Sequence, residues 1–445
     1  MRSVRGQFGL GWVLAICGLG LLSGGCSGNE GDSPNDEHAG SGVVSELRSN
    51  APRVTPDATE GKTAAQGEQA FGVAFLHALD PNENTAFSPH SLSTAFAMLT
   101  DAAEGQTLAE VEQALSFGTT DEAFHRSQGA LQLGLRARNR EALQTADHTV
   151  DAQILTESND VWLRDDVPPT PSYLDTLARY YGVGVHRADF ANKPEEARVA
   201  INAKVSNDTH SLISELIPKR SINDKTVAVL TNALYFKAPW ATPLGKPAAG
   251  QFQKLDGSTS EVQMMRTGGQ LRYYPGNAFV SVALPYYGSE LELQLIVPDV
   301  GAYETVRSAL SSDVLSQTVT AGTFEQVDLT LPKFDVKSVV PAKDVLKSLG
   351  VVTAFDKEAA SFPAFASPVF DNVYVSDVLH QATVAIDEKG TEASAATAIV
   401  LSGVTSSIEP EPITPKVIVA DRPFLFVIRD NPTGALLFVG QVVAP

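Results

Sequence analysis

The sequence DEKGTEASAAT, from Asp387 to Thr397, combines one glycine with a run of very small side chains. Alternate positions from Thr391 onward carry threonine or alanine, so an extended strand would place four small side chains on one face. Glu392 and Ser394 would then point toward water. With Gly390 as a flexible pivot, the segment could form an exposed loop or a strand inserted in a sheet. The alternative is an alanine-rich helix that begins at Thr391.

The sequence on either side of this segment favours the loop that can insert. Upstream, Val378 to Ile386 reads VLHQATVAI, and downstream, Ala420 to Pro445 reads ADRPFLFVIRDNPTGALLFVGQVVAP. Together they resemble the proximal hinge of the reactive loop and the C-terminal signature of the serpin family. The resemblance covers roughly Ala64 to Pro445, in the family's order. Further matching segments are NTAFSPHSLSTAFAML (Asn84 to Leu99), AEGQTLAEV (Ala103 to Val111), VLTNALYFKAPW (Val229 to Trp240), ALPYYGSELELQLIVP (Ala283 to Pro298) and LTLPKFDV (Leu329 to Val336).

Length and composition predict one large folded domain. The chain has 445 residues, of which 43% are hydrophobic and 19% charged, as in soluble globular proteins with a substantial core. The net charge of -19 disfavours nucleic acid as a partner, and no Lys/Arg cluster suits a polyanion. The two cysteines, Cys17 and Cys26, precede the folded part, so we expect neither disulfides nor thiol chemistry there. We expect the protein to be a monomer.

The N-terminus is typical of a bacterial secretory signal. Arg2 and Arg5 precede an apolar stretch from Phe8 to Leu22, which is too short for a comfortable membrane span. LSGGC, ending at Cys26, is similar to the lipobox of bacterial lipoproteins, although Ser23 occupies the usual aliphatic position. We therefore expect a lipid anchor on Cys26 and an outer-membrane protein that faces the periplasm or the cell surface. The alternatives are an ordinary cleaved signal, with release to the exterior, and an uncleaved anchor.

A polar tether is predicted between this signal and the folded domain. Residues 27–62 are rich in Gly, Ser, Asn, Asp, Glu and Pro and carry few apolar side chains that could be buried. The sequence thus predicts a signal peptide at 1–25, a disordered tether at 26–63 and a serpin-like domain at 64–445.

Sequence patterns indicate an α+β domain with helices first and antiparallel strands later. Val227 to Phe236 is apolar or small on both faces, which is typical of a central strand. Leu291 to Val297 alternates, so we expect Glu292 and Gln294 on a more exposed face. A terminal hairpin is predicted from Phe424 to Val439. Thr107 and Glu110 form a capping-box pattern. The resemblance implies three sheets, about nine helices and an exposed reactive loop.

Conventional catalytic motifs are absent from the sequence. It contains no HExxH, GxSxG, CxxC or GxGxxG arrangement, and its eight histidines are scattered rather than spaced as metal ligands. We therefore expect no metal, no cofactor and no enzymatic activity.

The resemblance instead implies a suicide-substrate inhibitor. A target serine protease would attack the exposed loop and form a covalent acyl-enzyme, and the freed loop would enter the large sheet and carry the protease to the opposite pole. Distortion of the protease's oxyanion hole and triad would leave the acyl bond unhydrolysed. Inhibition of cysteine proteases is a minor variant. The alternative is a non-inhibitory binding or carrier protein whose loop is cleaved without inserting.

Family spacing, counted from Glu388, places the reactive bond between Val404 and Thr405. Because Gly390 to Arg422 is several residues longer than usual, Leu401-Ser402 and Thr405-Ser406 remain alternatives. A β-branched side chain at this bond would suit the small apolar pocket of an elastase-like protease, or a chymotrypsin-like one. The hinge residues that the resemblance implies are Glu388, Gly390, Thr391, Glu392, Ala393, Ser394, Ala395, Ala396 and Thr397.

The resemblance also points to residues at the place where central strands must part. Ser88, Ser91, Asn232 and His380 match the polar cluster called the shutter, whose structural alternative is a set of satisfied buried polar groups. Trp240 matches a tryptophan at the top of the sheet, the breach, although the preceding proline is unusual. Two departures from the family are Pro239 and Lys204, the latter standing where a tryptophan is usual, which leaves the local helix packing open.

Overall fold

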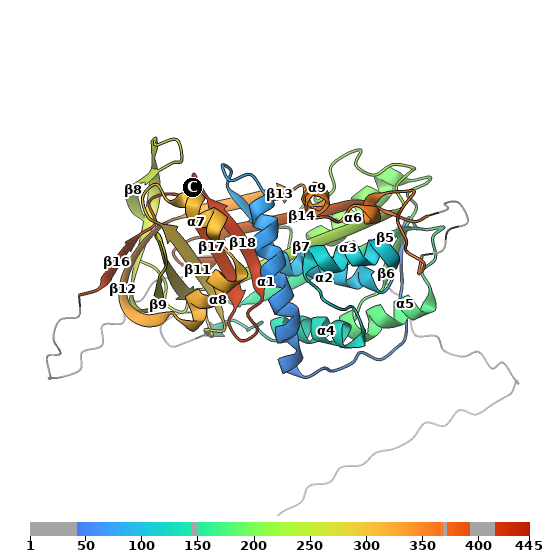
Figure 1. Cartoon of the computed structure of the whole chain (residues 1–445), viewed down its shortest axis with the longest axis horizontal. Helices are drawn as coiled ribbons and strands as arrows, with labels where there is room; N and C mark the ends of the chain where they lie inside the picture. The colour runs from blue at the N-terminus through green and yellow to red at the C-terminus, as the bar shows by residue number, and fades with distance from the viewer. Residues whose placement is uncertain (1–41, 145–148, 366, 368–371, 392–413) are drawn as a thin grey trace, which may run out of the picture. The chain divides into compact units, whose positions relative to one another are not determined.

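Two large β-sheets and the helices packed on them organise the folded part of the chain (Figure 1). The structure is a computed structural model and describes residues 42–144, 149–365, 367, 372–391 and 414–445. Cys26, the hinge residues from Glu392 to Thr397 and the predicted reactive bond Val404-Thr405 lie outside these ranges. Within them, no helix is both long and apolar enough to cross a bilayer.

The predicted α+β class is confirmed, with nine α-helices and three sheets in the described ranges. The helices are α1 (Gly61–Ala78), α2 (Pro89–Thr100), α3 (Gly105–Leu115), α4 (Glu122–Arg136), α5 (Pro171–Thr176), α6 (Pro194–Asp208), α7 (Tyr303–Ala309), α8 (Ser312–Thr320) and α9 (Ala342–Ser348), with short turns η1 (Ala58–Glu60), η2 (Leu177–Tyr181) and η3 (Thr353–Phe355).

The strands fall into sheets of seven, nine and two. The first has, in spatial order, β1 (Val44–Leu47), β6 (Val185–Ala188), β5 (Ile154–Arg164), β7 (Ala228–Pro239), β15 (Gly390–Thr391), β14 (Val375–Ile386) and β13 (Phe334–Val340). The second has β16 (Lys416–Val419), β12 (Thr323–Pro332), β9 (Thr259–Pro275), β10 (Phe279–Pro285), β11 (Leu291–Pro298), β17 (Phe424–Asp430), β18 (Leu436–Val442) and β2 (Thr85–Phe87), while β8 (Ala248–Gln253) pairs with β9. The third pairs β3 (Leu143–Gln144) with β4 (Thr149–Val150).

The predicted central strand is β7, which is covered on both faces. On one face, Leu230 joins the core beneath α2. On the other face, Val229 packs with Ile201 of α6, and Ala233 packs with Val205 of the same helix. Two buried faces explain why the sequence of this strand is apolar almost throughout.

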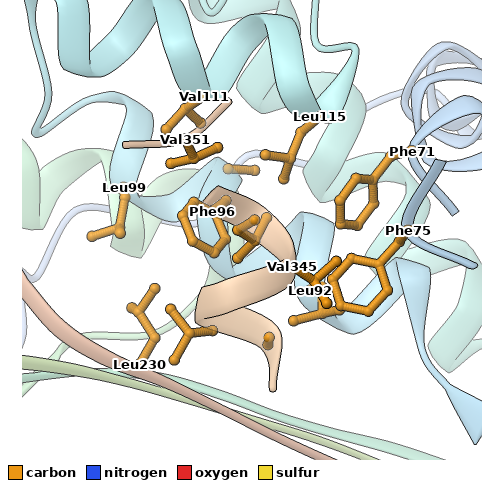
Figure 2. Close-up of a cluster of buried hydrophobic side chains, with 14 of the residues drawn as sticks. Phe71, Phe75, Leu92, Phe96, Leu99, Val111, Leu115, Leu230, Val345 and Val351 are labelled. Carbon is orange, nitrogen blue, oxygen red and sulfur yellow. The ribbon is translucent and has the colours of Figure 1, made fainter. Parts of the chain in front are cut away.

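Helix α2 fills the space between the seven-stranded sheet and the neighbouring helices. Its N-cap residue Ser88 accepts a hydrogen bond from the Ser91 backbone N–H, and Pro89 occupies the first turn. Figure 2 shows Phe96 of this helix among side chains from α1, α3, α9 and β7. All 12 residues of α2 are buried, so the helix is enclosed by the rest of the domain rather than amphipathic.

The terminal hairpin is confirmed, since β17 pairs antiparallel with β18. The expected exposure of Glu292 and Gln294 is wrong, because they are 4% and 2% exposed. The Gln294 amide donates to Ser281 and to Thr318 of α8, and the Glu292 carboxylate accepts from Arg272. The alternation of apolar and polar residues in this strand therefore reflects two buried faces, of which one is apolar and the other is held by polar contacts.

The capping-box interpretation is also wrong. Helix α3 begins at Gly105, and its N-cap residue makes no side-chain cap. The Thr107 hydroxyl accepts from the Ser361 backbone N–H at 3.0 Å, and the Glu110 carboxylate accepts from the Thr353 N–H at 2.7 Å. Both side chains tie the helix to a distant loop instead of closing its first turn.

Part of the segment predicted as a tether lies in the seven-stranded sheet, as strand β1 (Val44–Leu47). Strand β1 pairs antiparallel with β6, from Val44 opposite Ala188 to Leu47 opposite Val185. Strand β1 is held by backbone hydrogen bonds, which form without an apolar sequence. The polar composition of this segment therefore gave no sign that it is folded.

Candidate functional site

Strands β7 and β14 are paired directly over only part of their length. Their parallel pairing runs from Ala228 opposite Val375 to Ala233 opposite Gln381. Beyond that point β15 lies between them, with Thr391 opposite Ala238 of β7 and opposite Ile386 of β14. The first two residues of the predicted loop thus already occupy the position of a new central strand, and we call the line between β7 and β14 the seam.

Gly390 is required by the close approach of β15 to β7. A Cβ atom at this position would lie 2.1 Å from the Ala238 carbonyl oxygen and 2.8 Å from the Pro239 Cα, distances that Cβ atoms essentially never show. The unusual Pro239 is tolerated because it ends the strand, and its carbonyl accepts from the Tyr287 N–H at 2.8 Å.

A tight turn carries the chain from β14 back into the seam. The Asp387 carboxylate accepts from the Lys389 N–H at 2.8 Å and from the Gly390 N–H at 3.2 Å. Glu388 forms an ion pair with Lys333 at 2.9 Å, whose hydrogen bond holds the pKa of Glu388 below its usual value. Both groups are partly exposed, so this pair positions the turn more than it stabilises the fold.

Two stacked aromatic rings hold the turn and the start of the loop. The ring centroids of Trp240 and Tyr286 lie 4.5 Å apart, and the angle between the ring planes is 11°. The Trp240 indole N–H donates to the Asp387 carbonyl at 2.9 Å, and the Tyr286 hydroxyl is 2.6 Å from the buried Thr391 hydroxyl. Trp240 therefore has a specific partner beyond core packing, and Tyr286 is a contact that the sequence analysis missed.

The predicted shutter residues are brought together beneath the seam. The Ser88 backbone N–H donates to His380 Nε2 at 3.0 Å, so the proton of this ring is on Nδ1, which donates to Asn232 Oδ1 at 3.0 Å. Burial lowers the pKa of His380 to about 3, which keeps the ring neutral. The Ser91 hydroxyl donates to Asn159 Oδ1 at 2.8 Å, which adds a residue that sequence reasoning did not select.

Two buried amide donors in this cluster are unpaired. The Nδ2 atoms of Asn232 and Asn159 have no hydrogen-bond partner among the residues that the structure describes. Since a buried unpaired donor is costly, the cluster favours any rearrangement that brings an acceptor to it.

On the opposite face of the sheet, Lys204 takes part in a network of charges. Its ammonium lies 2.9 Å from Asp160 of β5 and 2.7 Å from Asp208 of its own helix, α6. Burial by itself would raise the pKa of Asp160, but hydrogen bonds from His186 and Lys204 outweigh burial and lower this pKa to about 2. At the position where the family usually has a tryptophan, an ion pair thus connects α6 to the sheet.

We expect Gly390→Ala to dislodge β15 from the seam, because the added methyl group collides with the backbone of β7. Hydrogen exchange should become faster in residues 238–240 and 386–391. The matched control is Gly134→Ala in α4, where a Cβ meets nothing within 4 Å. Unchanged exchange in Gly390→Ala would show that β15 is not held by this contact.

Acidification should destabilise the protein through His380. Its pKa is depressed in the folded state, so the unfolded chain takes up a proton first and stability falls as pH drops from 6.5 toward about 3. Between pH 6.5 and pH 5, wild type should lose about 2 kcal/mol more unfolding free energy than His380→Gln. Urea unfolding at the two pH values measures this difference, and equal losses would contradict it.

Comparison with known proteins agrees with this geometry. The family model for serpins (serine protease inhibitors) matches residues 66–445. Human antithrombin-III is 30% identical over 400 residues, which cover 88% of this chain and 84% of that protein. A serine protease inhibitor of Cyanea capillata is 31% identical over 371 residues, covering 82% and 93%. The crystal structure of the thermophilic serpin tengpin in its native state matches with a TM-score of 0.79 at 26% identity, covering 91% of this chain and all of that one. The chain therefore belongs to the serpin family.

Proposed function

We propose that this protein is an irreversible inhibitor of serine proteases that traps its target by inserting the cleaved loop into the seam between β7 and β14. The observation that carries the proposal is the position of β15, which already pairs with both strands. Its relative from Cyanea capillata is named a serine protease inhibitor, and the matching family model carries the same description. We extend this activity to the present chain, without enzymatic function of its own.

The register of β15 defines where an inserted loop would lie. Continued residue by residue along β7, it sets Thr397 opposite Asn232, and continued along β14 it sets Thr397 opposite His380. Asn232 and His380 are themselves opposite each other, so the two registers agree. The inserted strand can therefore replace the direct pairing without a shift in either neighbour.

The loop sequence fits the chemistry of this path. Thr391 is buried beside Tyr286, so every second residue after it would face the same inner side of the sheet. Ala393 and Ala395 are small enough to pass between strands, and Thr397 would bring a hydroxyl acceptor to the unpaired Asn232 amide. Insertion would satisfy a buried donor as well as add backbone hydrogen bonds.

We further propose Val404-Thr405 as the reactive bond and an elastase-like or chymotrypsin-like protease as the target. In the same register, Leu401 would lie opposite Ala228, the first residue of β7, so a loop cleaved after Val404 is long enough to fill the seam. The protein would act outside the cytoplasm, anchored by lipid at Cys26 to the outer membrane.

The direct test of function is incubation of the domain with a panel of serine proteases. We expect a denaturant-resistant covalent complex and, for protein nicked in the loop, a higher melting temperature, because the inserted strand adds hydrogen bonds and buries apolar surface. Nicked protein that melts like intact protein, with no covalent complex, would support a non-inhibitory carrier instead.

The position of the reactive bond can be tested separately. Val404→Arg should redirect inhibition from elastase-like toward trypsin-like proteases, since a deep acidic pocket binds a cation and a shallow apolar one does not. Mass spectrometry of the released C-terminal peptide is expected to give a fragment that begins at Thr405. A fragment that begins at Ser402 or Ser406 would move the bond to one of the alternatives.

A further inference from the structure

Three ionisable side chains are buried together where α1, α2 and β5 meet. His90 of α2 lies between two carboxylates, with its Nδ1 2.8 Å from Glu68 of α1 and its Nε2 3.1 Å from Glu157 of β5. The exposed fractions of these side chains are 0% for His90 and Glu68 and 2% for Glu157. The inhibitory mechanism described above does not use this group, which we call the His90 cluster.

The geometry requires shared protons within the His90 cluster. Both ring nitrogens face carboxylate oxygens, so each contact needs a hydrogen between the two atoms. Burial by itself would lower the pKa of His90, but the two adjacent carboxylates outweigh burial and raise this pKa to about 10. Burial raises the pKa of Glu68, whereas the charge and hydrogen bond of His90 outweigh burial and lower that of Glu157. The contact between His90 and Glu157 is therefore a charge-assisted hydrogen bond.

Helix α2 is connected to both sides of the seam. On the β14 side, the Ser88 N–H donates to His380, and the preceding strand β2 contacts both β13 and β14, with the Ala86 N–H bound to Ser338 of β13. On the β5 side, the hydrogen-bonded connections are Ser91 to Asn159 and His90 to Glu157. Because β2 continues directly into α2, the helix stays with β13 and β14 when the seam opens.

Opening must therefore stretch the connections to β5. One additional strand widens a sheet by about 4.8 Å, which exceeds the range of a hydrogen bond. Glu157 would leave both His90 and its other partner, Gln132 of α4, whose amide lies 3.2 Å away. Glu68 belongs to α1, which packs on α2, and it would remain beside His90.

We propose that His90 and Glu157 are positioning residues that hold β5 against α2 and thereby slow the opening of the seam. The inference rests on the proposed function in that insertion of the loop is the step which needs this opening. Removing the charge at Glu157 should accelerate opening about tenfold, which corresponds to about 1.4 kcal/mol of activation free energy.

A synthetic peptide with the sequence TEASAATAIVLS, residues 391–402, measures opening without any protease, through its rate of annealing to the intact protein. We expect faster annealing to Glu157→Gln and to Glu157→Asp, which keeps the charge but shortens the side chain. The matched control is Glu68→Gln, which removes a charge from the same cluster but leaves the His90 and Glu157 side chains in place, and it should accelerate annealing less than Glu157→Gln.

The pH dependence separates this role from general destabilisation. Because its pKa is raised in the folded state, His90 contributes stability below pH 6.5 that is lost as pH rises through about 10. Wild-type annealing should accelerate over that range, and Glu157→Gln should change less. Glu68 of α1 and Glu157 of β5 face His90 directly, and the charged and polar groups around Glu157 are Gln132 and Arg136 of α4 and Arg53 from the segment before α1.

The possible outcomes distinguish this inference from the proposed function. Equal annealing rates for wild type and both Glu157 variants would overturn the role of the His90 cluster and leave inhibition by insertion intact. Acceleration in Glu68→Gln as large as in Glu157→Gln would also overturn it, since loss of stability alone would then explain the effect. A peptide that anneals to none of these proteins would overturn both proposals.

Discussion

The hydrogen bonding of the seam between β7 and β14 is the constraint on which the rest of this structure depends. Up to the Ala233–Gln381 pair the two strands bond to each other, and further along the seam Ala238 and Pro239 of β7 and Ile386 of β14 pair with β15. Each arrangement satisfies backbone groups, so the sheet has two compatible pairings of the same strands. The turn at Asp387, the Trp240–Tyr286 stack and Gly390 all act at the point where one pairing gives way to the other.

Two fully buried histidines near the seam differ in charge because their hydrogen-bond partners differ. His380 faces an amide oxygen and a backbone N–H, so burial dominates and its pKa falls to about 3. His90 is buried as deeply, but two carboxylates raise its pKa to about 10. The β14 side of α2 is thus joined by a neutral hydrogen bond and the β5 side by a charged one.

Strand β5 carries charged contacts on both faces. Glu157 meets His90 of α2 on one face, and Asp160 meets Lys204 of α6 on the other. Such buried pairs contribute little net stability when compared with apolar packing, but losing one partner of a pair is expensive. Their effect is therefore on which elements move together, because a separated charge must find a new partner or water.

Much of the fold could be predicted from the sequence, because local patterns survive folding. The continuous apolar run of β7, the terminal hairpin and the small residues after Gly390 depend on side-chain size and alternation, which are visible in one dimension. The predicted shutter residues are assembled in the structure. Glu292, Gln294 and Thr107 were misjudged because their partners come from distant segments.

The sequence by itself determined which segments become central strands and that the loop begins with a glycine and small residues suited to insertion. Only the tertiary structure decided that β1 belongs to the folded unit, that Tyr286 receives Thr391, and that His90 lies between two carboxylates. These contacts join residues from 22 to 105 positions apart along the chain, or strands that pair through their backbones. Residue type says that such groups can bond, but only the packing of the elements brings them within reach of one another.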